Sequence, residues 1–407
     1  MSFPGVIFAD RRTPPTLLTL ILLTSVSSLT MNAFIASLPA LADDLGTSYA
    51  FIQLAVSGYL GMTALMQLAI GPLSDRYGRR PVILVSLVIF TFASIGCVLA
   101  TDAVTFMIFR MTQAAIATGI ALSRAIVRDL LPAEESASMI GYMTAAVALV
   151  PMMGPMFGGA MEEAFGWRST FWAFVVLGGV VLVVCWLDLG ETHHNRASSF
   201  TKQLGAYPDL LRARRFWGYT MTAAFASGSF FALLGGGPYV AREIFGQSPA
   251  ATGLYLGMLA FGYMLGNLVT GRYAQEIGIN RLMFIGCLIA STGIGVGLLV
   301  DLFVVQHPLA VFGFCVFIGL GNGLTMPTAT TGLLSIRPGL AGSASGLGGA
   351  MMIGGGAAVS AVAGAILSPE SGASPLLMLM FATAVLSALT SLYVIRRSKS
   401  VAAHHGS

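Results

Sequence analysis

Twelve apolar runs, each of roughly 20 residues, recur along the whole chain. As an α-helix, with a rise of about 1.5 Å per residue, such a run crosses the hydrocarbon core of a bilayer, which is about 30 Å thick. A transmembrane β-barrel would instead show alternating strands of about ten residues. The sequence therefore predicts a polytopic, all-α membrane protein. The predicted spans are 15–37, 49–71, 80–100, 104–127, 136–160, 169–189, 216–240, 249–272, 280–301, 308–333, 341–367 and 374–395.

Composition supports this class, because 56% of the residues are hydrophobic and 9% are charged, whereas about a quarter of the residues in a soluble domain are charged. The first run also has features of a signal peptide, because Arg11 and Arg12 precede it and Ala-Leu-Ala at 40–42 resembles a cleavage site. Its apolar stretch is longer than the roughly 7 to 15 residues of a signal-peptide core. We therefore interpret it as the first membrane helix.

The basic residues are distributed unevenly between the two sides of the membrane. If the runs alternate in direction, 17 of the 21 Lys and Arg residues lie on one side. Arg168 and Arg242 lie in loops on the other side, and Arg110 and Arg124 lie within the fourth run. Loops rich in Lys and Arg stay in the cytoplasm, so we expect both termini to be cytoplasmic. Because these loops would face anionic lipid, the net charge of +4 requires no nucleic-acid partner.

A long polar stretch divides the chain into two halves of six predicted helices. We expect an N-terminal six-helix bundle at 1–190, a cytoplasmic linker at 191–215 and a C-terminal six-helix bundle at 216–407. The segment 71–78 after the second run has a weaker counterpart at 271–278, which is 200 residues later. One large class of secondary transporters is built from such parallel repeats, with the substrate site between the halves near the middle of the membrane.

The loop from Gly71 to Pro81 has a distinctive pattern, Gly-Pro-Leu-Ser-Asp-Arg-Tyr-Gly-Arg-Arg-Pro. Its glycines permit a tight reversal, and Asp75 can cap a helix or pair with an arginine. A loop that only set the topology would need the arginines but not this spacing. The pattern resembles the signature loop of the major facilitator superfamily, which lies between the second and third helices. The resemblance implies a fold of twelve transmembrane helices in two pseudo-symmetric six-helix bundles and transport by alternating access.

Two further stretches resemble motifs of the drug:proton antiporters in that superfamily. They are Arg-Met-Thr-Gln-Ala at 110–114 in the fourth run and Pro-Met-Met-Gly-Pro-Met-Phe-Gly-Gly at 151–159 in the fifth. Shorter stretches at 124–129, 166–168 and 341–345 are similar to the Bcr/CflA branch, as is Glu-Thr at 191–192. This branch includes bicyclomycin and chloramphenicol-type exporters. The resemblance implies multidrug efflux of small amphipathic compounds, including antibiotics, by proton antiport across a bacterial inner membrane.

Arg110 is the candidate with the strongest physical argument. A charge inside a membrane helix costs about 2.5 to 3.5 kcal/mol on insertion scales, so such a residue usually faces a cavity or a partner. The alternative is an arginine that extends to the outer interface. The resemblance implies a role in proton coupling, and Gln113 lies one turn further along the helix. The predicted substrate cavity comprises Asn32, Gln53, Tyr59, Gln67, Arg110, Gln113, Phe231 and Tyr255.

Two other sets are expected to control conformation. Charged residues at helix ends would hold the cytoplasmic side closed, although exposed charge pairs alone stabilise little. Small residues and prolines in the fifth helix would allow close packing and bending, or packing alone. The predicted cytoplasmic gate is Gly71, Asp75, Arg76, Gly78, Arg79, Arg128 and Asp129, and the fifth-helix set is Pro151, Gly154, Pro155, Gly158 and Gly159.

The chain departs from the Bcr/CflA pattern in its first helix. Exporters of that branch generally carry the pattern Asp-x-Tyr-Leu-Pro-x-Leu-Pro, in which the aspartate stands seven residues before the second proline. In this chain, the residue seven positions before Pro39 is Asn32. No acidic residue lies deep in a predicted span, because Asp188 and Asp301 end theirs. Proton coupling normally needs a carboxylate or histidine that titrates as access alternates.

Three explanations remain open. The proton is carried by a carboxylate at a helix end, such as Asp75 or Asp129; or the ligand itself brings the charge; or coupling is lost. In the last case the protein would be an uncoupled or differently coupled facilitator or importer of a small metabolite. An anionic metabolite would suit Arg110 or Arg124, since both charges within the spans are positive.

Other functions are disfavoured. The four cysteines lie within predicted spans without paired spacing, and the five histidines lie in loops or the tail, so we expect no metal or other cofactor. No set of catalytic groups indicates an enzyme, and no loop is long enough for a receptor domain. The chain lacks an ATP-binding GxxxxGK[ST] loop. We expect a small-molecule substrate, proton and membrane lipid as partners, and a functional monomer; the identity of the substrate depends on side-chain positions that a sequence does not define.

Overall fold

In the computed structural model, every regular element among the described residues is a helix, which confirms the predicted all-α class. Helices satisfy all backbone hydrogen bonds within one segment, as a lipid environment requires. The predicted linker, 191–215, lies largely outside the described residues. These run from 8 to 405, apart from 132–134, 136–138, 141–142, 144–146, 148–149, 193–207, 209, 337–340 and 369.

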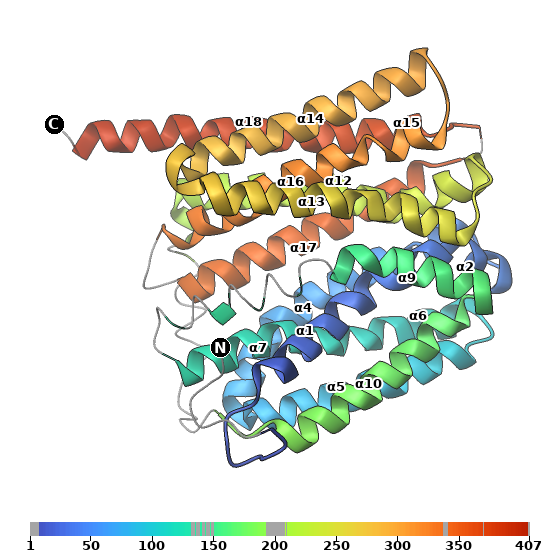
Figure 1. The fold of residues 1–407 in the computed structure, drawn as a ribbon, viewed down its shortest axis with the longest axis vertical. Coiled ribbons are helices and arrows are strands. Elements are labelled where there is room, and N and C mark those ends of the chain that lie inside the picture. Colours follow the sequence, from blue (N-terminus) through green and yellow to red (C-terminus); the bar gives the residue numbers. More distant parts are fainter. Residues whose placement is uncertain are drawn as a thin grey trace. The chain divides into compact units, whose positions relative to one another are not determined.

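The chain divides into two compact units, Met1–Phe200 and Thr201–Ser407, which we call unit 1 and unit 2. In unit 1, α1 packs against α7, α9 and α10, while α5 packs against α6 and α10 (Figure 1). The elements of unit 1 are α1 (Leu17–Asn32), η1 (Ala33–Ser37), α2 (Leu38–Asp44), α3 (Tyr49–Ile52), α4 (Leu54–Tyr77), α5 (Arg79–Leu99), α6 (Ala103–Thr112), η2 (Gln113–Ala117), α7 (Thr118–Leu130), α9 (Val150–Phe165) and α10 (Arg168–Asp188).

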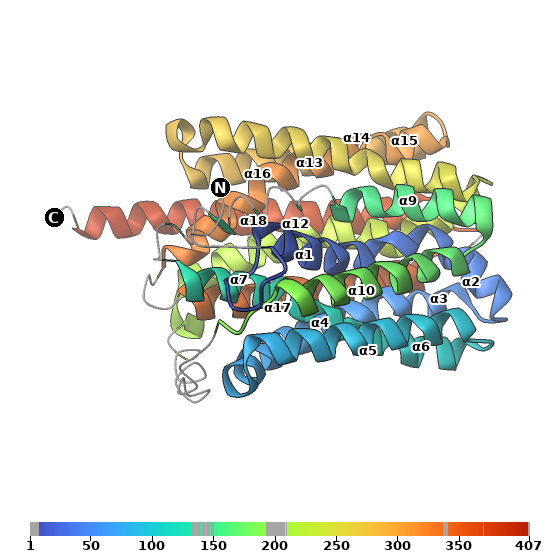
Figure 2. The ribbon, with the colours of Figure 1, turned by 60° about the horizontal axis from the view of Figure 1, so that its bottom comes forward.

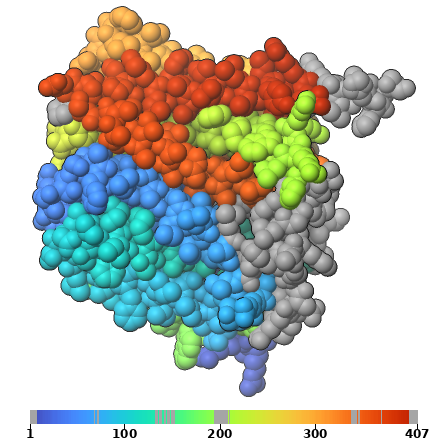
Figure 3. Space-filling view, turned by 180° about the vertical axis from the view of Figure 1, so that it is seen from behind, coloured from blue at the N-terminus to red at the C-terminus, as the bar shows by residue number. Residues whose placement is uncertain are grey.

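In unit 2, α16 packs against both α13 and α14 (all three are labelled in Figure 2), and α17 lies alongside α18 (orange and red in Figure 3). The α13 and α16 backbones approach closely because glycine lines their contact. A Cβ atom at Gly262 would collide with the Val316 carbonyl oxygen, and one at Gly319 with that of Leu259. The elements are α12 (Arg214–Tyr239), η3 (Val240–Ile244), α13 (Pro249–Ile277), α14 (Ile279–Phe303), α15 (Pro308–Phe312), α16 (Cys315–Leu334), α17 (Ala341–Ile366) and α18 (Ser374–His405).

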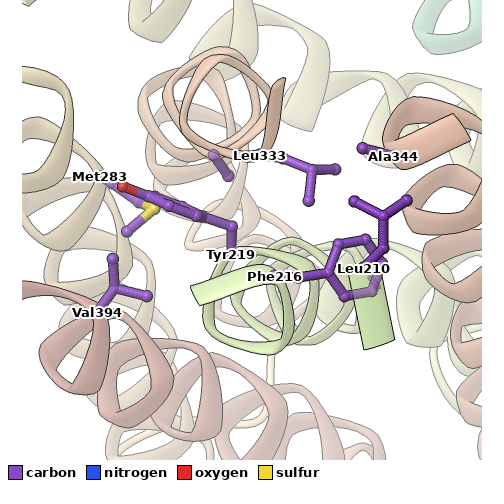
Figure 4. Close-up of a cluster of buried hydrophobic side chains, with 8 residues drawn as sticks. Leu210, Phe216, Tyr219, Met283, Leu333, Ala344 and Val394 are labelled. Carbon is purple, nitrogen blue, oxygen red and sulfur yellow. The ribbon is translucent and has the colours of Figure 1, made fainter. Parts of the chain in front are cut away.

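A buried apolar cluster joins five helices of unit 2 to the segment that precedes α12 (Figure 4). Phe216 and Tyr219 project from the first turns of α12, and the Tyr219 hydroxyl donates to Asn280 Oδ1 at 2.7 Å. Burial of the aromatic rings, with the one hydroxyl satisfied, favours this packing. The cluster consists of Leu210, Phe216, Tyr219, Met283, Ala329, Leu333, Ala344 and Val394.

Ten helical stretches among the described residues are long and apolar enough to cross a membrane. The first stretch, Leu17–Asp44, extends beyond the predicted span because η1 and α2 continue α1. The fifth and seventh predicted spans correspond to α9 and α12, which are not among the ten. The chain is therefore a multi-pass membrane protein, and the full count of twelve spans stays a prediction.

The 200-residue repeat is visible at two matching turns. Gly78 ends α4 and begins α5, and Gly278 ends α13 and begins α14. Their φ angles are +98° and +85°, a region that residues with a side chain rarely adopt. Each glycine N–H donates to the carbonyl four residues earlier, Ser74 at 2.9 Å and Ala274 at 3.1 Å. The two loops thus have the same backbone design.

Candidate functional site

Arg110 is completely buried inside unit 1, at the junction of three membrane-spanning segments. Its Nε donates to the Ala55 carbonyl of α4 at 3.2 Å, and its Nη2 donates to the Thr30 carbonyl of α1 at 3.0 Å. Its Nη1 donates to Gln113 Oε1 at 2.8 Å, and Gln113 Nε2 donates in turn to Ser94 Oγ at 2.8 Å. The guanidinium thus connects α1, α4 and η2 through hydrogen bonds, and it does not extend to the surface.

Two aromatic rings cover the same guanidinium. Arg110 Cζ lies 4.1 Å from the ring centroid of Phe34 and 3.9 Å from that of Tyr59, and both rings are buried. Desolvated contacts of this kind are worth about 2 kcal/mol. No ion pair among the described residues includes Arg110, so backbone carbonyls, one amide and two π faces compensate for its burial.

The first membrane segment changes its helical type beside this arginine. The α-helical part, α1, ends at Asn32, and the tighter 3₁₀ segment η1 follows from Ala33 to Ser37. Carbonyl groups in the last turn of an α-helix lack their usual partners four residues ahead. The Thr30 carbonyl lies in this turn, which explains why it is available to Arg110.

Asn32 lies next to this site in a closely packed contact. It is 1% exposed, and its Oδ1 has no hydrogen-bond partner among the described residues. The antiporter-like helix, α9, packs directly on η1. A Cβ atom at Gly154 would lie 3.2 Å from the Ala33 nitrogen, and one at Gly158 would collide with the Ala33 carbonyl oxygen. These glycines are therefore what lets α9 approach Asn32 and Ala33.

The remaining predicted cavity residues do not all belong to one unit. The structure brings Tyr59 and Gln113 to Arg110, while Gln53 is buried at the start of α4 and Gln67 is half-buried further along it. Phe231 and Tyr255 belong to unit 2, where each packs within its own unit. The Phe231 ring lies against Gly356, and the Tyr255 ring stacks on Phe312 with centroids 5.2 Å apart.

The predicted gate residues include a partly buried charge cluster centred on Arg79. Its Nη1 lies 2.7 Å from Asp75 Oδ1, its Nε lies 3.1 Å from Asp129 Oδ2, and it also donates to Ser74 Oγ. The Arg79 side chain is 9% exposed, so these pairs are better shielded from solvent than ordinary surface ion pairs.

Most other members of the gate and fifth-helix sets lie within the described part of the chain. Arg76 and Arg128 are exposed. Pro155 lies inside α9, and Gly159 is buried on it. The surroundings of Gly71 and Pro151 lie outside the described residues.

Glu191 has a role that the sequence analysis did not identify. Its Oε1 accepts from the Arg79 N–H at 2.9 Å, and its Oε2 accepts from the Arg80 N–H at 3.3 Å. A carboxylate at a helix N-terminus satisfies free N–H groups and complements the helix dipole. Glu191 thus caps α5 directly after Gly78. Its place in the Glu-Thr stretch at 191–192 was the only sequence signal.

Three carboxylates are buried among the described residues, and the sequence analysis placed two of them only at helix ends. Asp188, at the end of α10, caps α1 through bonds from the Thr16 N–H at 2.8 Å and the Thr19 hydroxyl at 2.6 Å. Asp301, near the end of α14, is 3% exposed. The third, Glu162, lies inside α9 because this helix continues to Phe165, beyond the predicted end of the span at 160.

No group of three or more His, Cys, Asp and Glu residues in the described part of the chain is placed to hold a metal ion. The four cysteines are buried and free.

Comparison with known proteins identifies the family. A chloramphenicol resistance protein of Pseudomonas aeruginosa is 30% identical over 314 residues, covering 76% of this chain and 74% of that protein. The MFS-type transporter YdgK of Bacillus subtilis is 30% identical over 380 residues, which cover 90% of this chain and 92% of that protein. The fold is shared by a solved bacterial homologue of the human lysosomal transporter Spinster, in an inward-facing and unoccupied conformation. The TM-score is 0.72, the sequence identity is 18%, and the match covers 94% of this chain and 96% of that chain. The profile of the Major Facilitator Superfamily matches residues 20–361, and the chain therefore belongs to this superfamily of membrane transporters.

Proposed function

We propose that this chain is a secondary active exporter of small amphipathic organic compounds, including antibiotics, driven by proton antiport. It acts as a monomer in a bacterial inner membrane, with both termini in the cytoplasm. The bundles 1–190 and 216–407, joined by the linker 191–215, rock to expose the substrate site alternately to the two sides. It transports its substrate and does not transform it chemically.

The single observation that carries this proposal is the buried Arg110. Its hydrogen bonds reach Thr30, Ala55 and Gln113 on different segments of unit 1, so movement of one segment changes the contacts of the others. A buried charge is costly, and it is usually retained in a membrane protein for a functional reason. Two aromatic faces beside a cation also suit the amphipathic ligands expected of an exporter. The name of the Pseudomonas relative supports an amphenicol as the first substrate to test.

In this proposal, the cluster of Arg79, Asp75 and Asp129 stabilises one state of the transport cycle. It connects the end of α4 to the end of α7. Release of such a cluster is a common way to convert a local change into a movement of whole helices.

Transport in liposomes tests the function. Purified protein is reconstituted, and uptake of labelled chloramphenicol is followed with and without an imposed pH gradient, for the wild type and for Arg110→Ala. Antiport requires that the wild type accumulates the drug above its equilibrium level only when the gradient is present. The Arg110→Ala variant should lose this accumulation. Equilibration without accumulation would reject antiport.

A second candidate function is uncoupled or differently coupled transport of a small anionic metabolite, in either direction. The presence of Asn32 in place of a helix-1 carboxylate favours it. In that case, wild-type flux would follow the metabolite gradient alone. Parallel uptake assays with small organic anions at equal pH on both sides distinguish the two functions.

A further inference from the structure

The chain before α1 is fastened to the end of α10 (dark blue beside α10 in Figure 1). The Ala9 N–H donates to Asp188 Oδ1 at 3.0 Å, and the Thr16 N–H donates to Asp188 Oδ2 at 2.8 Å. The Arg11 carbonyl oxygen lies so close to Gly190 that a Cβ atom there would be 2.6 Å from it. Ala9 has a φ of +63°, the only positive φ outside glycine in the described part of the chain. Such a backbone angle persists where the surroundings hold it, so these contacts define the conformation of the segment.

This conformation brings two arginines to Trp186, in the last turn of α10. Arg11 Cζ lies 4.0 Å from the centroid of the Trp186 ring. Arg80, at the start of α5, donates from Nη2 to the Trp186 carbonyl oxygen at 3.2 Å and from Nε to the Leu189 carbonyl oxygen at 2.7 Å. Two guanidinium groups therefore contact the same residue, one at its ring and one at its backbone.

These arginines are available to an external anion. Within the described part of the chain, no ion pair includes Arg11, Arg12 or Arg80, and Arg11 and Arg12 are exposed. The carboxylates nearby accept from backbone N–H groups instead. Asp10 Oδ1 accepts from the Arg12 N–H at 3.0 Å, and Glu191 Oε2 accepts from the Arg80 N–H at 3.3 Å.

An exposed apolar stripe leads away from Trp186 along α10. Val176, Val180, Val183 and Trp186 follow one another at spacings of three or four residues, which places them on one face of the helix. Their exposed fractions are 61%, 52%, 54% and 49%. Both α10 and α5, which packs against it, are long and apolar enough to cross a membrane. The stripe therefore faces acyl chains, and Trp186 lies at its polar end, where tryptophan and arginine are typically found.

The 200-residue repeat does not account for this arrangement. The counterparts of Arg80 and Trp186 in unit 2 are Asn280 and Leu386. Asn280 Oδ1 accepts from the Tyr219 hydroxyl at 2.7 Å, so it serves the internal packing of its own unit. The combination of arginines and tryptophan is thus a separate feature of unit 1.

From this arrangement, we propose that Arg11, Arg80 and Trp186 form a binding site for an anionic phospholipid. The lipid phosphate accepts from the two guanidinium groups, whose planar donors suit phosphate oxygens. An acyl chain lies along Val183 and Val180, and Trp186 lies at the level between headgroup and chain. A soluble phosphate would gain nothing from the apolar stripe. The site goes beyond the proposed transport function, and its test requires no transported substrate.

Quenching of tryptophan fluorescence by brominated lipid tests the site. The protein is reconstituted in phosphatidylcholine bilayers with increasing fractions of phosphatidylglycerol, and either lipid carries bromine on its acyl chains. The signal of Trp186 is the difference between each protein and the same protein with Trp186→Phe. We expect brominated phosphatidylglycerol to quench Trp186 with a preference of about tenfold over brominated phosphatidylcholine, as one contact between charged groups can supply.

Variants of neighbouring arginines show whether the preference belongs to this site. We expect Arg11→Gln to reduce it to about twofold, and Arg11→Lys, which retains the charge beside the ring, to keep most of it. Arg12→Gln is the matched control, because it removes the same charge one residue away from an arginine that has no contact with Trp186. It should keep the wild-type preference.

Three results would overturn the inference. Equal quenching of wild-type Trp186 by the two lipids would show that no selective site exists. Equal losses in Arg11→Gln and Arg12→Gln would show only a diffuse attraction between a basic surface and anionic lipid. Relief of the quenching by inorganic phosphate, compared with sodium chloride at matched ionic strength, would assign the site to a soluble anion.

Discussion

The Nη2 atom of Arg110 donates to the Thr30 carbonyl oxygen at 3.0 Å, and this bond joins the fourth membrane segment to the first, just before the first changes from α to 3₁₀ geometry. The carbonyl lies in the last α-helical turn, where the regular ladder of hydrogen bonds ends. The buried arginine and the local irregularity of the backbone therefore meet at one point of the fold.

The contacts of Arg110 predict that Arg110→Lys will not preserve function. An ammonium group lacks the planar array of donors that reaches Ala55, Thr30 and Gln113 together. We expect at least a tenfold loss of chloramphenicol transport in liposomes. Unsatisfied buried groups should also lower stability by about 1–3 kcal/mol, measured as a lower Tm in detergent. Arg272→Lys, at an exposed position on α13, serves as the control and should change neither quantity.

The close contact between α9 and η1 predicts that Gly158→Ala is damaging. The new Cβ atom would collide with the Ala33 carbonyl oxygen, and overpacking of this kind typically costs about 1–3 kcal/mol. We expect a lower Tm and slower counterflow exchange. Gly179→Ala in α10 is the matched control, because nothing lies within 4 Å of its added Cβ atom. Equal effects of the two variants would show that the glycine contact is unimportant.

The Arg79 cluster predicts unequal effects of neighbouring arginines. Arg79→Ala leaves Asp75 and Asp129 without this partly buried partner, so we expect a loss of about 1–3 kcal/mol. Arg76→Ala removes an exposed side chain, and its effect should stay within about 0.5 kcal/mol. Thermal unfolding of both variants measures the difference, and a destabilised Arg76→Ala protein with an unaffected Arg79→Ala protein would contradict it.

The position of Asn32 predicts that a carboxylate there changes the response to pH. Asn32 is buried next to Phe34, whose ring covers Arg110, so a titrating group at this position would act directly on the site. We expect counterflow by Asn32→Asp to vary with pH more steeply than counterflow by the wild type. Asn32→Leu, which cannot titrate, is the control and should show no added pH dependence.

Asp102 predicts a small effect of pH on stability. The Thr105 N–H donates to Asp102 Oδ1 at 2.9 Å, and this bond holds the pKa of the exposed carboxyl below its usual range. Because the folded state favours the carboxylate, the stabilisation is present above the pKa of the unfolded chain and is lost as pH falls through the lower folded pKa. The Tm of the wild type should therefore decline on acidification more than that of Asp102→Asn, whose amide still caps α6.

Much of the fold could be predicted because its signals are local. Apolar length identifies a membrane helix wherever it occurs, so the class and most spans needed no tertiary contact. The repeated turns at Gly78 and Gly278 were visible as a pattern, because a backbone with positive φ favours glycine at each place. The motif at 110–114 likewise identified Arg110 and Gln113 as neighbours one turn apart.

Tertiary structure decided the partners. The burial of Arg110 is compensated in part by backbone carbonyl groups, which every residue carries and no sequence pattern marks. Glu191 bonds to Arg79, which is 112 residues away in the sequence, and Asp188 bonds to Thr16, which is 172 residues away. Glu162 lies near a helix end in the sequence, and only the packing of the chain shows that it is buried. Apolar length is a property of each segment alone, whereas a buried polar contact depends on which segments fold against one another.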